Sequence, residues 1–389
     1  MVTILHFADL HLDTDFRSVA GAARGANSAR RSLHRCLERI IAIAQERGVD
    51  ALAVGGDLYE HDHREQETWR FIAEQFSHIP DIPVFIAPGN HDPAKPDSLY
   101  NSGLLPDNVR AFRSQSLEAM PLSDDVIVWG AGWPDYTWDG SPLGGSFRVP
   151  EDGRAHLLLL HGTLVEGGFS GDERDYCPFN EADVRGAGFT AALLGHIHRA
   201  RVHNGASRCF YPGSTQALTF NETGEHWALL FEVDPGRLTC EKIVVSDLPL
   251  AVLDVTVDEV LGEHELLERA RAALAEREVS RGMAKLRLVG TRRLDAAFSA
   301  EDLAADLSDG DLLVAVADES LPGYDFEALA HGPTTRACFV RRLLAERDRA
   351  PQEEKALYQD ALVLGLRAFE GAKLQPLWEP PLEEEDKER

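Results

Sequence analysis

Short apolar runs alternate with amphipathic stretches over the first 250 residues of the chain. Runs that lack strict polar alternation are typical of strands covered on both faces. Apolar side chains recur at helical spacing from Leu33 to Ala44, with Gly48 as a stop signal, and this pattern predicts a helix over residues 29–47. A second helix is expected over residues 65–77. Strands are expected at residues 3–8, 51–55, 84–87, 126–130, 156–160, 192–194 and 226–233. Together these elements predict a layered α/β fold.

The pattern changes near residue 250. A helix is predicted over residues 263–276, between strands at 252–257, 285–289 and 312–317, which makes a small α+β unit. Two further helices, at 337–346 and 354–370, precede a proline-containing segment and an acidic tail. We therefore predict three domains, over residues 1–250, 251–330 and 331–389.

The composition is that of an ordinary globular protein, with 44% hydrophobic and 27% charged residues among 389. No apolar run approaches the length that spans a bilayer, and the N-terminus lacks the pattern of a secretory signal, so we expect a cytoplasmic protein with no membrane association. The five cysteines show no CxxC spacing, which argues against a zinc knuckle and a disulfide framework.

The formal net charge of −26 constrains the partners of the chain. Nucleic-acid-binding surfaces are usually basic, because neutralising phosphates supplies most of the affinity. The charge therefore disfavours a protein that binds DNA on its own. Any contact with nucleic acid is expected to be local, centred on metal ions, or supplied by a partner.

Five short motifs rich in metal ligands each follow a predicted strand. Open α/β sheets place their sites at the carboxyl ends of strands. Carboxylate, amide and imidazole donors together suit manganese, and they also hold iron or zinc. Seven such donors exceed the needs of one ion, whereas two ions bridged by a carboxylate would use all of them. The motifs are Asp9-Leu-His11, Gly56-Asp57, Gly89-Asn90-His91-Asp92, His161-Gly162 and Gly195-His196-Ile197-His198.

The order DxH, GD, GNHD, HG, GHxH resembles the calcineurin-like metallophosphoesterase superfamily. The resemblance implies an α/β/β/α sandwich and a metal-dependent phosphoesterase that holds two divalent ions, Mn²⁺ being expected. It also implies that Asp57 bridges the ions. By the same resemblance, the first ion would be held by Asp9, His11 and His198, and the second by Asn90, His161 and His196.

The histidine of the GNHD motif has a separate role in this superfamily. The resemblance implies that His91 is not a ligand, and that it stabilises the transition state or protonates the leaving oxygen. Asp92 is expected to orient His91, because a carboxylate can fix the tautomer of an imidazole.

Within the superfamily, the segments HFADLHLD, GGDLYE and YPGSTQALTFNETG resemble the SbcD-type DNA repair exonucleases. This resemblance implies DNA as the substrate, a capping domain over residues 251–330, and C-terminal helices that dock on an SbcC-type coiled-coil ATPase. It also implies a homodimer formed by helices of the phosphoesterase domain. The chain departs from some nuclease members at Glu60, where they carry a histidine.

Two rival functions remain open on the sequence alone. One is a phosphodiesterase for cyclic nucleotides, nucleotides or phospholipid headgroups, and the other is a metal-stabilised scaffold that recruits an ATPase. The apolar stripes of the C-terminal helices could likewise dock a partner or pack within their own domain. Trp129, Trp133, Tyr136 and Trp138 could stack on bases or belong to the core, whereas His61 and His63 are expected to be exposed.

Overall fold

The computed structural model describes residues 1–14, 23–63, 66–144, 147–165, 176–203, 208–246, 248–309 and 311–371. The chain divides into two compact units. The first comprises Met1–Val252, Arg277–Lys285 and Ala304–Ala315, and the second comprises Leu253–Glu276, Leu286–Leu303 and Val316–Arg389. The domain boundaries expected at residues 250 and 330 stay predictions.

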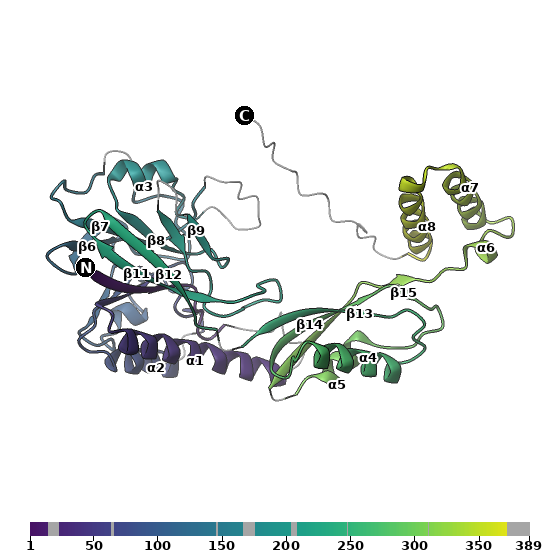
Figure 1. The fold of residues 1–389 in the computed structure, drawn as a ribbon, viewed down its shortest axis with the longest axis horizontal. Helices are drawn as coiled ribbons and strands as arrows, with labels where there is room; N and C mark the ends of the chain where they lie inside the picture. Colours follow the sequence, from purple (N-terminus) through teal and green to yellow (C-terminus); the bar gives the residue numbers. More distant parts are fainter. Residues whose placement is uncertain are drawn as a thin grey trace. The chain divides into compact units, whose positions relative to one another are not determined.

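Two six-stranded sheets form the framework of the first unit (Figure 1). In the first sheet the order is β12-β11-β1-β2-β3-β4, and the pairs from β1 to β4 are parallel. In the second sheet the order is β5-β6-β7-β8-β10-β9, with β6, β7, β8 and β10 parallel. The strands are β1 (Val2–Phe7), β2 (Ala51–Val54), β3 (Val84–Ile86), β4 (Val109–Ala111), β5 (Glu118–Pro121), β6 (Val126–Gly130), β7 (Ala155–His161), β8 (Ala191–Gly195), β9 (Arg201–His203), β10 (Cys209–Tyr211), β11 (Trp227–Asp234) and β12 (Arg237–Val244).

The core of the first unit has three layers. Side chains of both sheets, such as Ile4 and Leu157, form one buried cluster between the sheets. The outer face of the first sheet packs against α1 (Ala23–Arg47) and α2 (Gln66–Ser77), and that of the second sheet packs against α3 (Glu181–Ala187). A short 3₁₀ helix, η2 (Leu99–Asn101), follows β3. The expected α/β/β/α sandwich is therefore confirmed.

The segment after residue 250 forms a smaller, three-stranded sheet with the order β13-β14-β16. Every strand and helix that the sequence predicted there is present. The elements are β13 (Leu250–Thr256), α4 (Glu263–Glu276), β14 (Gly282–Val289), β15 (Thr291–Arg292), α5 (Ala300–Leu307), β16 (Leu312–Asp318) and β17 (Leu321–Pro322), of which β15 and β17 pair in parallel.

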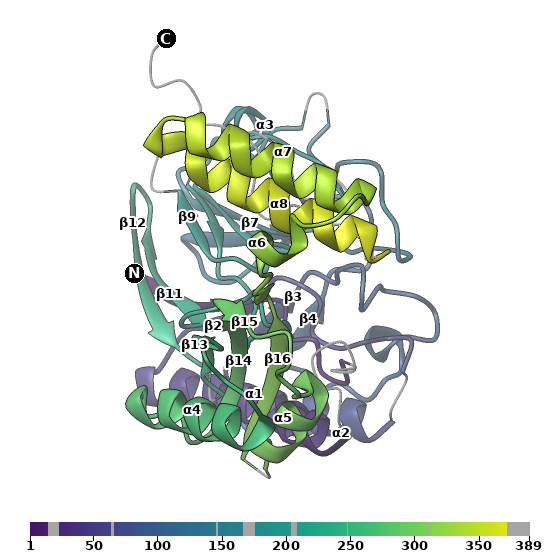
Figure 2. The same ribbon diagram turned by 90° about the vertical axis from the view of Figure 1, so that its right-hand side faces the viewer.

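A helical hairpin ends the described part of the second unit, with α7 and α8 side by side (Figure 2). The side chain of Thr334 accepts the backbone N–H of Ala337, which fixes the start of α7. Gly365 lets the two helices approach, because a Cβ at that position would overlap the ring of Phe339. The helices are α6 (Phe326–Leu329), α7 (Thr335–Arg349), the 3₁₀ turn η3 (Gln352–Glu354) and α8 (Lys355–Phe369). No helix in the described ranges is both long enough and apolar enough to cross a bilayer.

Candidate metal centre

The ends of five strands deliver all seven expected ligands to the same edge of the sandwich. Asp9 and His11 follow β1, Asp57 follows β2 and Asn90 follows β3, while His161 is the last residue of β7 and His196 and His198 follow β8. These strands belong to both sheets, so neither sheet alone contains the site. The expectation that the motifs lie at carboxyl ends of strands is correct.

The backbone is unusual where the ligands leave the strands. Asp9, His11, Asp57 and His196 all have positive φ, between 50° and 100°. This left-handed region is unfavourable for residues that carry a Cβ, and such conformations cluster at functional sites. Gly89 meets a related demand, because a Cβ there would overlap the Asp57 carboxylate and lie 2.8 Å from the His161 ring. The local fold is therefore shaped around these side chains.

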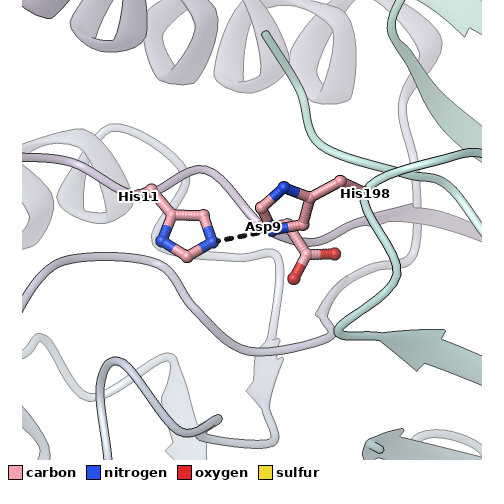
Figure 3. A group of neighbouring side chains, drawn as sticks. All are labelled: Asp9, His11 and His198. Atoms are coloured by element: carbon pink, nitrogen blue, oxygen red, sulfur yellow. Dashed lines mark hydrogen bonds between the residues drawn. The ribbon is translucent and has the colours of Figure 1, made fainter. Parts of the chain in front are cut away.

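Asp9, His11 and His198 point toward one another (Figure 3). The Nε2 atoms of His11 and His198 lie 3.2 Å apart, and donor atoms of all three residues lie within 4.8 Å of one another. The Asp9 carboxylate also accepts the backbone N–H of His196, at 3.0 and 3.2 Å. This group matches the set expected for the first ion.

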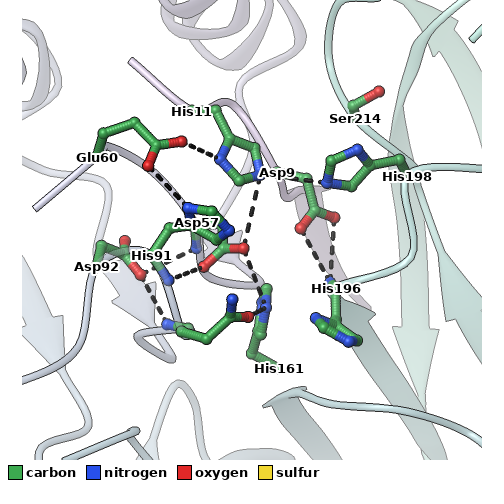
Figure 4. Close-up of polar contacts among 12 residues, drawn as sticks. Asp9, His11, Asp57, Glu60, His91, Asp92, His161, His196, His198 and Ser214 are labelled. Carbon is green, nitrogen blue, oxygen red and sulfur yellow. Dashed lines mark hydrogen bonds and ion pairs between the residues drawn. The ribbon is translucent and has the colours of Figure 1, made fainter. Parts of the chain in front are cut away.

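Asp57 lies between this group and a second one (Figure 4). Its Oδ2 is 3.6 Å from His11 Nε2 and 3.3 Å from His161 Nε2. The same His161 nitrogen lies 3.0 Å from Asn90 Oδ1. A carboxylate that faces ligands from both sets occupies the position that a bridging role requires.

His196 differs from the other expected ligands in how its ring is placed. The ring centroid lies 5.1 Å from that of His161 and 6.5 Å from that of Trp133. The imidazole belongs to none of the three groups of converging His, Cys, Asp or Glu donors found among the described residues. The structure thus brings the backbone of His196 to Asp9 and the ring to the neighbourhood of His161.

The tautomers implied by the hydrogen bonds make the cluster suited to a cation. His161 Nδ1 donates to the Gly55 carbonyl at 2.7 Å, and His11 Nδ1 donates to Glu60 Oε1 at 2.7 Å. In the neutral rings the Nε2 lone pairs therefore face Asp57, which itself can only accept while it is ionised. Lone pairs that converge on one another are unfavourable unless a positive charge lies between them. The donor set and its orientation fit divalent metal ions.

The pKa shifts of the clustered residues also favour a bound cation. Burial raises the pKa of Asp9. Burial lowers the pKa of His161 and of His198, but in each case the neighbouring carboxylates outweigh it and raise the pKa to about 9. The main partners are Asp57 for His161 and Glu222 for His198. A negative potential that favours imidazolium also favours a metal cation.

Glu60 holds two histidines at once, and the sequence analysis missed this role. Its Oε1 accepts from His11 Nδ1 and its Oε2 accepts from His91 Nδ1, both at 2.7 Å. Burial raises the pKa of Glu60, but the two histidines lower it to about 2, so the carboxylate is ionised. Its position three residues after Asp57 was the only available signal.

The expectation that Asp92 orients His91 is wrong. The Asp92 carboxylate accepts the backbone N–H groups of Asp57 at 3.0 Å, Leu58 at 2.8 Å and Gly89 at 2.7 Å, and also the hydroxyl of Tyr100. The two oxygens of Asp92 therefore accept four hydrogen bonds, three of them from the backbone of the loops after β2 and β3. Asp92 therefore fixes the backbone around Asp57, whereas Glu60 orients His91.

The aromatic set and the adjacent histidines divide between core and surface. Trp133 and Trp138 are core residues, and Trp133 Nε1 donates to the His161 carbonyl at 2.8 Å. His61 is fully buried beside the rings of Tyr59 and Tyr136, so its expected exposure is wrong. His63 is exposed, as expected, and Trp129 and Tyr136 are half-buried.

Residues 2–200 match the calcineurin-like phosphoesterase family. The chain belongs to this family. Residues 2–200 therefore form a domain of the metal-dependent phosphoesterase class, which confirms the expected enzyme class.

Two relatives and one solved structure are similar to the chain over part of its length. It is 29% identical over 268 residues to an uncharacterised metallophosphoesterase of Bacillus subtilis, YhaO, with 66% of this chain and 64% of the relative covered. It is 24% identical over 292 residues to the DNA double-strand break repair protein Mre11 of Methanopyrus kandleri, with 68% and 62% covered. The match thus spans less than two thirds of either relative. A dimetal phosphatase from Danio rerio aligns with a TM-score of 0.42 and 12% identity, over 63% of this chain and 96% of that chain.

Proposed function

We propose that this phosphoesterase hydrolyses phosphodiester bonds in DNA. The observation that carries the proposal is the convergence of Asp9, His11, His161 and His198 around the Asp57 carboxylate, with His91 beside them. The similarity to an archaeal double-strand break repair protein, at 24% identity, supports DNA as the substrate. The SbcD-type assignment is part of the same proposal.

We propose the two ligand sets that the family resemblance implies. Asp9, His11 and His198 hold one ion, Asn90, His161 and His196 hold the other, and Asp57 bridges them. We propose Mn²⁺ for both ions, because the donor set mixes oxygen with imidazole nitrogen. When bound, the ions supply Lewis acidity, which neutralises charge on phosphoryl oxygens and makes a water molecule more acidic.

His91 and Glu60 make up the part of the proposed mechanism that depends only on protein groups. Glu60 accepts from His91 Nδ1, so the ring is held with Nε2 as its remaining polar atom. His91 is 44% exposed, so a substrate can reach it. In the proposal, His91 Nε2 donates a hydrogen bond to the departing oxygen, while Glu60 holds both this ring and that of His11.

Parallel assays of linear DNA, cyclic nucleotides and bis(p-nitrophenyl) phosphate with Mn²⁺ test the proposed function. We expect cleavage of DNA and of bis(p-nitrophenyl) phosphate. Asp57→Ala protein purified in parallel must lose both activities, which excludes a contaminating nuclease. Hydrolysis of cyclic nucleotides with intact DNA would replace the proposal with its alternative.

That alternative, a phosphodiesterase for small molecules, is favoured by the net charge of −26. A chain with 39 basic and 65 acidic residues has few groups with which to neutralise a phosphate backbone. The charge has less influence on a substrate that carries a single phosphodiester. A DNA-cleaving form therefore needs a partner that supplies basic surface.

We propose that this partner is an SbcC-type coiled-coil ATPase that docks on the helices α7 and α8, and that the chain acts as a homodimer. Leu357 and Phe369 support the docking part, because they are exposed apolar residues of α8, at 60% and 48%. Leu357→Asp should weaken co-purification with the ATPase without changing Mn²⁺-dependent cleavage of a small phosphodiester. Normal ATPase binding by this variant would rule out that face of α8.

A further inference from the structure

A cavity of about 270 Å³ opens beside the metal centre, in the first unit. Its wall is formed by the residues after β8, the turn after β10, and the segment that leads into β11. The residues that carry the argument below are His198, Ser214, Asn221, Thr223 and Trp227. His198 is both a cavity-lining residue and one of the converging donors, so the cavity and the metal centre share a wall.

Glu222 fixes this shared wall. Its Oε1 accepts from His198 Nδ1 at 3.4 Å, and its Oε2 accepts from the Ser214 hydroxyl at 2.8 Å and from the Leu218 backbone N–H at 3.2 Å. Figure 4 shows Ser214 beside His198 on the side of the centre away from His91. These hydrogen bonds connect the loop after β10 to His198, an expected metal ligand. A group bound in the cavity would therefore have a fixed position relative to a phosphate bound at the ions.

The lining suits a flat, neutral, polar group better than a second phosphate. The lining contains one arginine, Arg199, and two carboxylates, Glu222 and Glu225, and this excess of negative charge opposes an anion. Trp227 is half-buried and offers an indole. Trp227 lines the cavity and its Nε1 donates to Glu225 Oε2 at 3.4 Å. Lys242, which is not part of the lining, lies 4.1 Å from the centroid of the Trp227 ring.

Polar groups at the rim add the capacity to hydrogen-bond an edge. Asn221 and Thr223 are exposed and line the cavity. An amide and a hydroxyl can both donate and accept, so they can pair with the edges of different bases. A nucleobase combines a π-face with a polar edge, and stacking on an aromatic side chain tolerates any base.

We propose that this cavity is a nucleoside-binding subsite, which takes the base and sugar next to the phosphate that is cleaved at the ions. The base packs against Trp227, with its polar edge toward Asn221 and Thr223. This inference rests on the proposed phosphodiesterase function and deepens it, because it names the residues that recognise the nucleoside beside the cleaved phosphate.

Two chromogenic substrates that differ in one group test the subsite. Thymidine 5′-monophosphate p-nitrophenyl ester carries a nucleoside, and bis(p-nitrophenyl) phosphate does not. The readout is the ratio of kcat/KM for the nucleoside ester to kcat/KM for the other substrate, measured with Mn²⁺. We expect Trp227→Ala to lower this ratio roughly 5- to 100-fold, the range that base–aromatic stacking spans.

Trp227→Phe and Trp129→Ala serve as matched variants. Phenylalanine keeps a ring at the site, so the ratio should stay within about threefold of the wild type. Trp129 is half-buried on β6 and does not line the cavity, so its loss should leave the ratio unchanged. Asn221→Ala, at an exposed position where folding is not at risk, should lower the ratio severalfold.

The outcomes separate the subsite from the function on which it depends. A wild type that cleaves neither substrate overturns the phosphodiesterase function and the subsite with it. A wild type that cleaves both, with the same ratio in Trp227→Ala and Asn221→Ala, overturns the subsite alone. Equal losses for both substrates in Trp227→Ala, with an unchanged ratio in Asn221→Ala, likewise assign Trp227 to packing and overturn the subsite.

Discussion

The metal centre and the C-terminal hairpin bury opposite kinds of side chain. In the centre, Asp9 and Asp57 are 0% and 2% exposed, although a buried carboxylate is unfavourable unless it is paired. In the hairpin the buried residues of α8 are apolar, while Leu357 of the same helix is 60% exposed. Carboxylates that are buried in spite of this energetic cost identify a functional site and its chemistry. An apolar stripe identifies only a packing surface, whose partner the stripe does not name.

The largest effect is expected from replacing Asp57, the residue that faces both proposed ligand sets. Asp57→Ala should bind less than one equivalent of Mn²⁺ at micromolar metal and lose more than about 10⁴-fold in turnover, because both ions depend on the bridge. Asp9→Ala should keep partial occupancy of the second site. Metal analysis after desalting measures this difference, with the exposed Asp124→Ala as the control. Two tightly bound ions in Asp57→Ala would refute the bridging role.

His91→Ala separates catalysis from metal binding within the centre. The variant should retain both ions and lose about 10²- to 10⁴-fold in kcat, the usual contribution of acid–base assistance. Glu60→Gln should lose about 10- to 100-fold, because it disturbs groups that position His91 and His11. Steady-state kinetics and metal analysis on the same samples check both results. Loss of metal from His91→Ala, to the extent seen in His161→Ala, would make His91 a ligand.

Leu366→Ala tests the hairpin in the same way. Leu366 is 1% exposed, so truncation should lower the free energy of local unfolding by about 2–5 kcal/mol. Amide hydrogen exchange in α7 and α8 should accelerate, while Mn²⁺-dependent cleavage of bis(p-nitrophenyl) phosphate stays unchanged. The exposed Leu357→Ala should shift exchange by less than about 0.5 kcal/mol. Equal effects of the two variants would mean that Leu357 is covered in solution.

The smallest effect is a difference in thiol reactivity between the two regions. Cys338 on α7 is exposed, whereas Cys36, Cys177 and Cys209 of the sandwich are buried. Burial also raises the pKa of Cys177, and that of Cys240 to about 11, which lowers their thiolate fractions. Alkylation at about pH 8, followed by mass spectrometry, should modify Cys338 first. Faster labelling of Cys36, Cys177 or Cys209 than of Cys338 would show that the first unit opens more readily than the hairpin.

The sequence predicted the elements of the site because their information is local. Asp9 and His11 stand one residue apart after an apolar run, and this arrangement shows both the strand end and the donor chemistry. The layered fold was predictable for the same reason, since each strand and helix has its own pattern.

What the sequence did not predict depends on segments that meet only in the folded protein. The Asp92 carboxylate accepts the backbone N–H groups of Asp57 and Leu58, which are 35 and 34 residues away in the sequence. No local sequence pattern shows that Asp92 binds these distant groups and not the side chain of its neighbour His91. Glu60 reaches His11, 49 residues away, in the same manner. His61 lies in a polar run and is nevertheless buried, because packing between aromatic rings overrides its polar neighbours.

The left-handed backbone at Asp9, His11, Asp57 and His196 has a consequence for how the protein can evolve. Each such conformation costs on the order of 1–3 kcal/mol for a residue with a Cβ. Glycine would relieve that cost at any of these positions, and it would remove a donor at the same time. Selection for thermal tolerance alone would therefore erode the active site before the core. The family member that melts latest in the absence of metal need not be the one that catalyses best.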